Sequence, residues 1–199
     1  MFRLRACRVL PLVALSLLIM TGPTIAHTEG SVAGGFLRGI WHPMSGFDHV
    51  VAMIAVGLWG AFLGAPGIWL LPIVFPMVMA FGGALGIIGV PIPSVEVGIA
   101  LSAIVLGLCV ALALRPPLWI AAIIVGTFAI FHGHAHGTEL PAAADAYAYA
   151  AGFVIATGLL HITGIMFGLL ARWEVGEMAV RAGGGLIALA GVAFLTKIA

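Results

Sequence analysis

The sequence has few charged residues: 8 Lys or Arg and 7 Asp or Glu among 199, or 8% of the chain. A soluble domain carries about a quarter, and 63% of this chain is hydrophobic. These proportions exclude a soluble globular protein and predict an all-α polytopic membrane protein, with the lipid bilayer as its surroundings. The chain also lacks a basic tract interleaved with aromatic residues, so we expect no nucleic-acid partner.

Cysteine is nearly absent as well. Cys7 lies in an N-terminal leader and Cys109 in the middle of an apolar segment. Removal of the leader would leave Cys109 alone, which excludes an intramolecular disulfide and argues against a thiolate metal site. A nucleotide-binding Walker motif is absent too, so we expect no direct use of ATP by this chain.

Residues 1–26 have the pattern of a cleaved secretory signal peptide. Arg3, Arg5 and Arg8 form a positive n-region, residues 9–20 are apolar, and Thr24-Ile25-Ala26 resembles a cleavage site. The alternative is an uncleaved first transmembrane helix. We expect cleavage, which leaves His27 as the mature N-terminus and residues 27–199 as one transmembrane domain.

Six apolar stretches approach the ~20 residues needed to span a bilayer. Short breaks rich in proline and glycine separate them. We therefore predict a bundle of six transmembrane helices at about 41–63, 67–90, 95–114, 117–138, 146–170 and 180–198.

Glycines recur four residues apart within these stretches, as in Gly82/Gly86 and Gly133/Gly137. Such pairs let transmembrane helices approach closely. We interpret them as packing positions.

Charge in the loops predicts the orientation. Arg115, Arg172 and Arg181 fall in alternate loops, and the other loops carry acids but no Lys or Arg. By the positive-inside rule, the arginine loops face the cytoplasm. We expect a multi-pass protein of a bacterial inner membrane with the mature N-terminus and the C-terminus outside.

Against this apolar background, histidine stands out. Two runs, His42-Pro-Met-Ser-Gly-Phe-Asp48-His49 and His132-Gly-His134-Ala-His136-Gly-Thr-Glu139, fall in the first and fourth predicted helices. Ionisable side chains at membrane depth are costly and indicate function. Imidazole with carboxylate suits a borderline divalent metal such as nickel, zinc or cobalt.

The spacing predicts which of these side chains share a helix face. His42 and His49, seven apart, should lie on one face of a continuous helix with Met53 one turn further on, and Asp48 points about 100° away. His132, His136 and Glu139 should form a second stripe, with His134 on the opposite face. The topology places both runs in the outer half of the bilayer. The predicted metal ligands are His42, Asp48, His49, His132, His136 and Glu139.

Four further residues have two interpretations each. His161, deep in the fifth helix, is either part of an ion path or a buried histidine bonded to a carbonyl. His134 is either a ligand or an outer, supporting residue, and Met53 either a ligand or ordinary packing. His27 at the mature N-terminus is either a capture ligand or an incidental residue.

The two histidine runs, together with the signal peptide and six helices, resemble the HupE/UreJ family of hydrogenase and urease accessory nickel permeases. The resemblance covers the whole chain. It implies secondary uptake of Ni²⁺ as the transported substrate, with Co²⁺ or Zn²⁺ as other candidates, for insertion into a nickel enzyme. It also implies nickel-enzyme maturation proteins as partners and the six predicted ligands as the family's positions.

Two alternatives remain open at this point. Three histidines and acids in a helical bundle also describe an intramembrane zinc hydrolase with an open coordination position. A metal chaperone or sensor would bind the ion without moving it. Uptake into sealed vesicles separates a permease from both.

Overall fold

The structure is a computed structural model that describes residues 32–139 and 145–198. These residues form helices joined by short loops and include no strand. The predicted signal peptide, with its cleavage site and His27, lies outside the described residues. The helices are α2 (Val32–Ser45), α3 (Phe47–Leu63), α4 (Gly67–Ile87), α5 (Val95–Ala111), α6 (Leu118–Thr138), α7 (Ala146–Gly168), the 3-10 turn η2 (Leu169–Arg172) and α8 (Glu174–Ile198).

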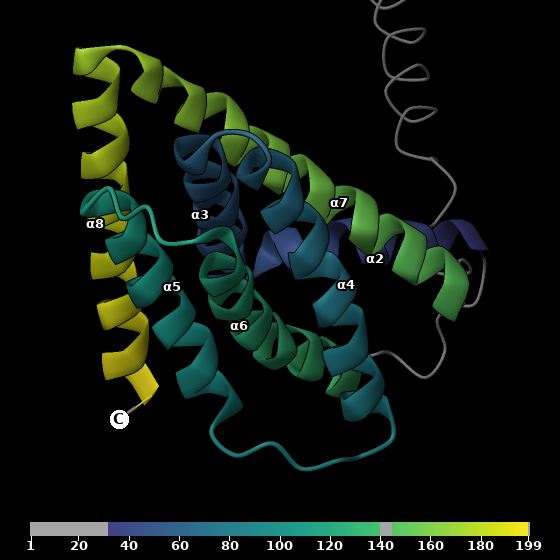
Figure 1. The fold of residues 1–199 in the computed structure, drawn as a ribbon. Helices are drawn as coiled ribbons and strands as arrows, with labels where there is room; N and C mark the ends of the chain where they lie inside the picture. The colour runs from purple at the N-terminus through teal and green to yellow at the C-terminus, as the bar shows by residue number, and fades with distance from the viewer. Residues whose placement is uncertain (1–31, 140–144, 199) are drawn as a thin grey trace, which may run out of the picture.

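Helix α3 is the centre of the bundle, and α4, α5 and α7 pack around it (Figure 1). Trp59, Met53 and Val56 of α3 are fully buried. A helix that is apolar all round belongs in the core. The remaining close pairs are α4 with α6, α5 with α8, and α2 with α7.

Glycine allows the α4–α6 pair to pack backbone against backbone. A Cβ on Gly133 would overlap the carbonyl oxygen of Met79, and one on Gly137 would overlap that of Gly83. Gly82 meets Ile130 in the same way. The predicted packing role of these glycines is confirmed, and the close approach fixes α6, which carries two of the predicted ligands and is followed directly by a third, Glu139.

The expected continuous helix over residues 41–63 is wrong. Helix α2 begins at Val32, ends at Ser45, and meets α3 at an 82° bend. Gly46 at the bend has an extended backbone (φ −89°, ψ 108°). A Cβ there would lie 3.0 Å from both Asp48 Oδ1 and His49 Nδ1, so glycine leaves room for that pair. His42 and His49 therefore lie on different helices rather than on one helix face.

The other ends differ by a few residues, except in the last helix. Helix α8 begins at Glu174, not at residue 180, so most of the loop expected between residues 170 and 180 belongs to the first turns of this helix. Glu174 and Glu177 lie at its N-terminal end, where the helix dipole favours acids.

By length and composition, four helical segments of the described chain can each cross a membrane: Gly67–Ile87, Leu118–Thr138, Tyr147–Arg172 and Glu174–Thr196. The bent α2–α3 pair would make a fifth span, and α5, with 17 residues, is shorter. The outer face of α4 is a continuous apolar stripe, since Trp69, Ile73, Met77 and Phe81 are each 59–69% exposed. Such a face suits lipid rather than water.

Candidate metal-binding site

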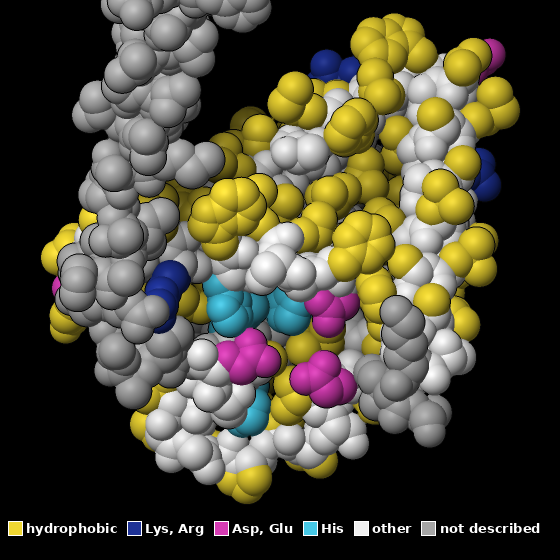
Figure 2. All heavy atoms as spheres, turned by 180° about the vertical axis from the view of Figure 1, so that it is seen from behind, with side chains coloured by type: hydrophobic (Ala, Val, Ile, Leu, Met, Phe, Trp, Pro, Cys, Tyr) yellow, Lys and Arg dark blue, Asp and Glu magenta, His cyan; other side chains and the backbone are white. Residues whose placement is uncertain are grey.

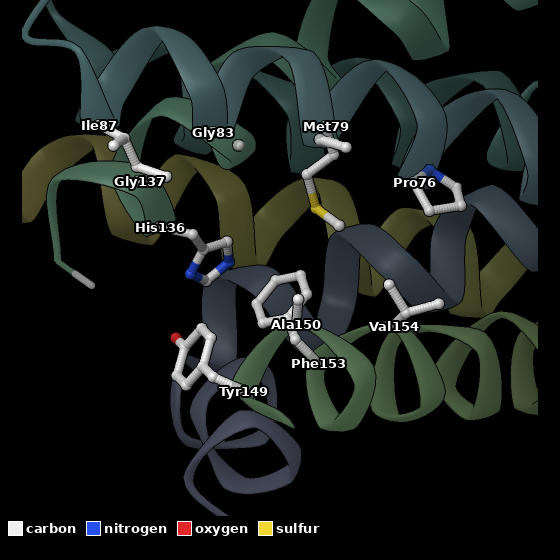
Figure 3. Close-up of a pocket in the computed structure, with 12 residues that line it drawn as sticks. Pro76, Met79, Gly83, Ile87, His136, Gly137, Tyr149, Ala150, Phe153 and Val154 are labelled. Atoms are coloured by element: carbon white, nitrogen blue, oxygen red, sulfur yellow. The ribbon is translucent and has the colours of Figure 1, made fainter. Parts of the chain in front are cut away.

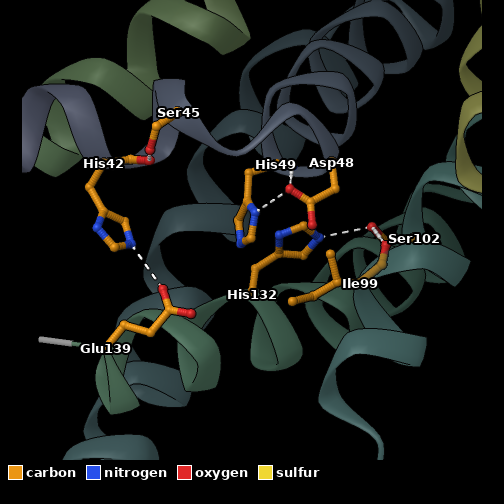
Figure 4. Close-up of polar contacts among 8 residues, drawn as sticks. All are labelled: His42, Ser45, Asp48, His49, Ile99, Ser102, His132 and Glu139. Atoms are coloured by element: carbon orange, nitrogen blue, oxygen red, sulfur yellow. Dashed lines mark hydrogen bonds and ion pairs between the residues drawn. The ribbon is translucent and has the colours of Figure 1, made fainter. Parts of the chain in front are cut away.

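The structure brings the two histidine runs together where α2, α3 and α6 meet. We call the six residues concerned the histidine cluster: His42, Asp48, His49, His132, His136 and Glu139. Figure 4 shows five of them, and Figure 3 shows His136. On α6, the rings of His132 and His136 both face His49, with centroid distances of 4.6 and 4.5 Å. Their spacing of four residues places them on one helix face.

One part of the cluster is arranged like a metal chelate. His42 Nε2 lies 3.2 Å from Glu139 Oε2, and the His42 and His136 rings are 4.7 Å apart. One ligand atom from each of these three residues lies within 4.8 Å of the others. Bonds of about 2.1 Å hold donors at most about 4.2 Å apart, so small side-chain rotations would close the three around one ion.

The Asp48 carboxylate orients His49. Its Oδ1 accepts hydrogen bonds from the backbone N–H of His49 at 2.8 Å and from the ring Nδ1–H at 2.9 Å. A carboxylate only accepts, so Nδ1 must carry the proton and Nε2 keeps its lone pair. Nε2 is buried and has no hydrogen-bond partner within the described chain. A histidine held by a carboxylate in this way is a typical oriented metal ligand.

Ser102 of α5 orients His132 in the same way, through a hydrogen bond to one ring nitrogen. Its hydroxyl donates to the Ile99 carbonyl at 2.6 Å, so its oxygen accepts from His132 Nε2–H at 2.8 Å. The lone pair of His132 therefore lies on Nδ1, a buried atom without a hydrogen-bond partner in the described part of the chain. Sequence reasoning missed Ser102, and its one signal was a hydroxyl within an apolar stretch.

The cluster runs from the surface into the core. The Glu139 side chain is 59% exposed and that of Asp48 28%, whereas His132 is fully buried. Figure 2 shows histidine and acidic side chains gathered in a hollow on one face of the molecule. The two solvent-accessible carboxylates match the charge of an entering divalent cation, and the imidazoles of His49, His132 and His136 lie deeper.

An apolar groove of about 200 Å³ between α4, α6 and α7 reaches the cluster at His136 (Figure 3). Tyr149 and Phe153 of α7 line it, and Phe153 lies 4.5 Å from the His136 ring between centroids. Tyr149 also lies edge-on to His42, at 5.8 Å. Its buried hydroxyl has no hydrogen-bond partner among the residues described. Sequence reasoning missed this tyrosine.

The remaining candidates lie outside the cluster. His134 is on the opposite face of α6, where Nε2 bonds the carbonyl of Val90 at 2.8 Å and ties down the loop after α4. Met53 is fully buried in the hydrophobic core. His161 is buried on α7, and the Phe75 ring lies 5.5 Å from both His132 and His161.

Comparisons with known proteins agree on one family. The family model described as HupE / UreJ protein matches residues 15–194, a span that contains the whole cluster. Protein HupE of Rhizobium leguminosarum bv. viciae is 48% identical over 174 residues, which cover 87% of this chain and 91% of that protein. No solved structure matches the chain. The family model and this relative each cover most of the chain, and it belongs to the HupE/UreJ family.

Proposed function

We propose that this chain carries a divalent transition-metal ion, nickel first, across the inner membrane into the cytoplasm. The observation that supports this most directly is the convergence of four imidazoles and two carboxylates from α2, α3 and the C-terminal end of α6 within an apolar helical bundle. In this proposal His42, Asp48, His49, His132, His136 and Glu139 hold the ion. Co²⁺ is the nearest competitor because it accepts the same donors.

The chemistry of the donors suits transport better than permanent storage. Donors arranged in series let an ion shed its water stepwise and still leave, which a single tight cage would prevent. A divalent ion entering a negative-inside cell gains about 4.6 kcal/mol per 100 mV, at about 2.3 per charge. That gain drives accumulation by a secondary, non-enzymatic carrier without ATP.

The proposal includes a topology and a role. Six spans follow a cleaved signal peptide, and both termini of the mature chain face outward, which places Asp48 and Glu139 at the outer entrance. The bent α2–α3 pair and the short α5 serve as two of the six spans. Membership of the HupE/UreJ family supports delivery of the ion to hydrogenase or urease maturation proteins.

Uptake by the purified full chain in sealed liposomes tests the function. We expect radioactive Ni²⁺ to accumulate when a potassium diffusion potential makes the interior negative, and excess Co²⁺ to reduce this uptake. Protein-free liposomes with the same potential are the control. Tight binding without uptake would instead identify a chaperone or sensor, and metal-dependent cleavage of membrane peptides would identify a hydrolase.

Tyr149 gives a second prediction, because the chain offers a matched control two residues away. Tyr149→Phe removes one buried oxygen beside His42 and His136, whereas the side chain of Tyr147 is 91% exposed. A buried hydroxyl without a partner costs about 1–3 kcal/mol, so its loss should not lower the melting temperature. We expect Tyr149→Phe to weaken nickel binding about three- to tenfold, because the hydroxyl then no longer supports the hydrated ion.

Titration calorimetry on both purified variants measures this effect. Tyr147→Phe should bind nickel like the wild type. Equal affinities for the two variants would show that the Tyr149 hydroxyl has no part in holding the ion.

A further inference from the structure

Two polar side chains of α7 are buried in the bundle outside the histidine cluster. His161 is 1% exposed and Thr157 is fully buried. They are four residues apart, one turn along the same face of the helix. Within residues 32–139 and 145–198, neither ring nitrogen of His161 has a hydrogen-bond partner. The Thr157 hydroxyl has none there either.

This lack of partners is unusual for both groups. Buried polar side chains are nearly always hydrogen-bonded, and a neutral imidazole always has one N–H to donate. A buried threonine in a helix can bond the carbonyl four residues back, as Thr163 of α7 does with Leu159 at 2.9 Å. Thr157 does not make such a bond. An apolar pair would pack here without this cost, so packing alone does not account for His161 and Thr157.

Their position relates them to the cluster. The Phe75 ring is fully buried and stands edge-on to His132 and to His161, 5.5 Å from each between ring centroids. His132 is the most buried histidine of the cluster. His161 therefore lies one aromatic ring beyond the buried end of the cluster.

We propose that His161 and Thr157 form a second, inner binding station for the divalent cation. A ring nitrogen of His161 and the Thr157 hydroxyl supply two donors, and water completes the coordination shell. With so few protein donors this station binds more weakly than the cluster, which lets the ion leave it. The inference rests on the proposed transport function and adds the step after His132.

The first test replaces His161 by leucine in the full chain. We expect nickel affinity at the cluster to stay within about twofold of wild type, and the melting temperature to hold or rise, because a buried imidazole without partners is removed. Nickel uptake into liposomes should fall at least about tenfold. Equilibrium dialysis at high nickel should also show that a weaker class of bound Ni²⁺ disappears.

Threonine provides a matched pair that changes shape very little. Thr157→Val should lower uptake several-fold, and Thr163→Val on the same helix should leave it unchanged. If the His161→Leu protein does not accumulate in the membrane, the comparison of Thr157→Val with Thr163→Val alone tests the inner station. Uptake at the wild-type level by both Thr157→Val and His161→Leu would overturn the inner station. It would also be overturned if these variants lost nickel affinity at the cluster as much as they lost uptake.

The two proposals fail in different ways. A wild-type protein that binds nickel but does not transport it refutes the transport function, and the inner station with it. A wild-type protein that transports nickel, alongside a fully active His161→Leu variant, refutes only the inner station.

Discussion

The His136→Ala protein should lose nickel uptake by at least about tenfold while remaining folded. His136 is the central contact of the histidine cluster, since its ring lies within 4.7 Å of those of His42, His49 and Phe153, between centroids. Both of its ring nitrogens are buried without hydrogen-bond partners in the described residues, so alanine breaks no hydrogen bond seen there. Loss of a residue that merely orients a ligand already costs about 10–100-fold in metal affinity, and loss of a ligand should cost no less.

His134 is the matched control on the same helix. It bonds the Val90 carbonyl on the opposite face of α6, and glutamine can keep a donor there. His134→Gln should retain uptake close to wild type, with protein abundance measured for both variants. If His134→Gln and His136→Ala lose uptake equally, the loss comes from a disturbed C-terminal end of α6 and not from a missing ligand. The assignment of His136 as a ligand would then be wrong.

The sequence predicted which histidines of α6 share a helix face, because helix periodicity alone decides this. In a helix, residues four apart share a face whatever surrounds them, so His132 and His136 face His49 while His134 faces the Val90 carbonyl. The glycine spacing likewise predicted close helix packing, and the structure adds that the partners are α4 and α6.

The bend between α2 and α3 could not be predicted in this way. Apolar residues continue through Gly46, and transmembrane helices tolerate glycine and proline where neighbours satisfy the backbone. Whether the chain bends there depends on the α2–α7 packing, which is a tertiary contact. The predicted face shared by His42 and His49 therefore failed, although both residues still reach the cluster from their separate helices.

Ser102 and Tyr149 were missed for a related reason. A serine in an apolar helix usually bonds a carbonyl of its own helix, and Ser102 does so with Ile99. Its second bond, to His132, joins residues 30 apart in sequence. Only the arrangement of α5 beside α6 reveals it.

Gly133→Ala should be the most damaging small substitution near the cluster, although it removes no ligand. The added methyl group would overlap the Met79 carbonyl oxygen and lie 2.8 Å from the Gly83 backbone nitrogen. Both obstacles are backbone atoms of α4, so a side-chain rotation cannot relieve them. Overpacking of this kind typically costs about 1–3 kcal/mol or more. Gly133 lies next to His132, so a displaced α6 also moves His132 and His136 away from His49.

Gly126→Ala on the same helix separates this effect from the general cost of altering a buried glycine. The nearest atom to its added Cβ is Val78 Cγ2 at 3.7 Å, an ordinary contact. Alanine is also favoured over glycine within a helix by about 0.5–1 kcal/mol. Gly126→Ala should therefore match or exceed the wild-type melting temperature in detergent and keep nickel uptake. Gly133→Ala should lower the melting temperature by several degrees and uptake by at least about tenfold. Equal melting temperatures and uptake for the two variants would mean that the α4–α6 contact does not position the cluster.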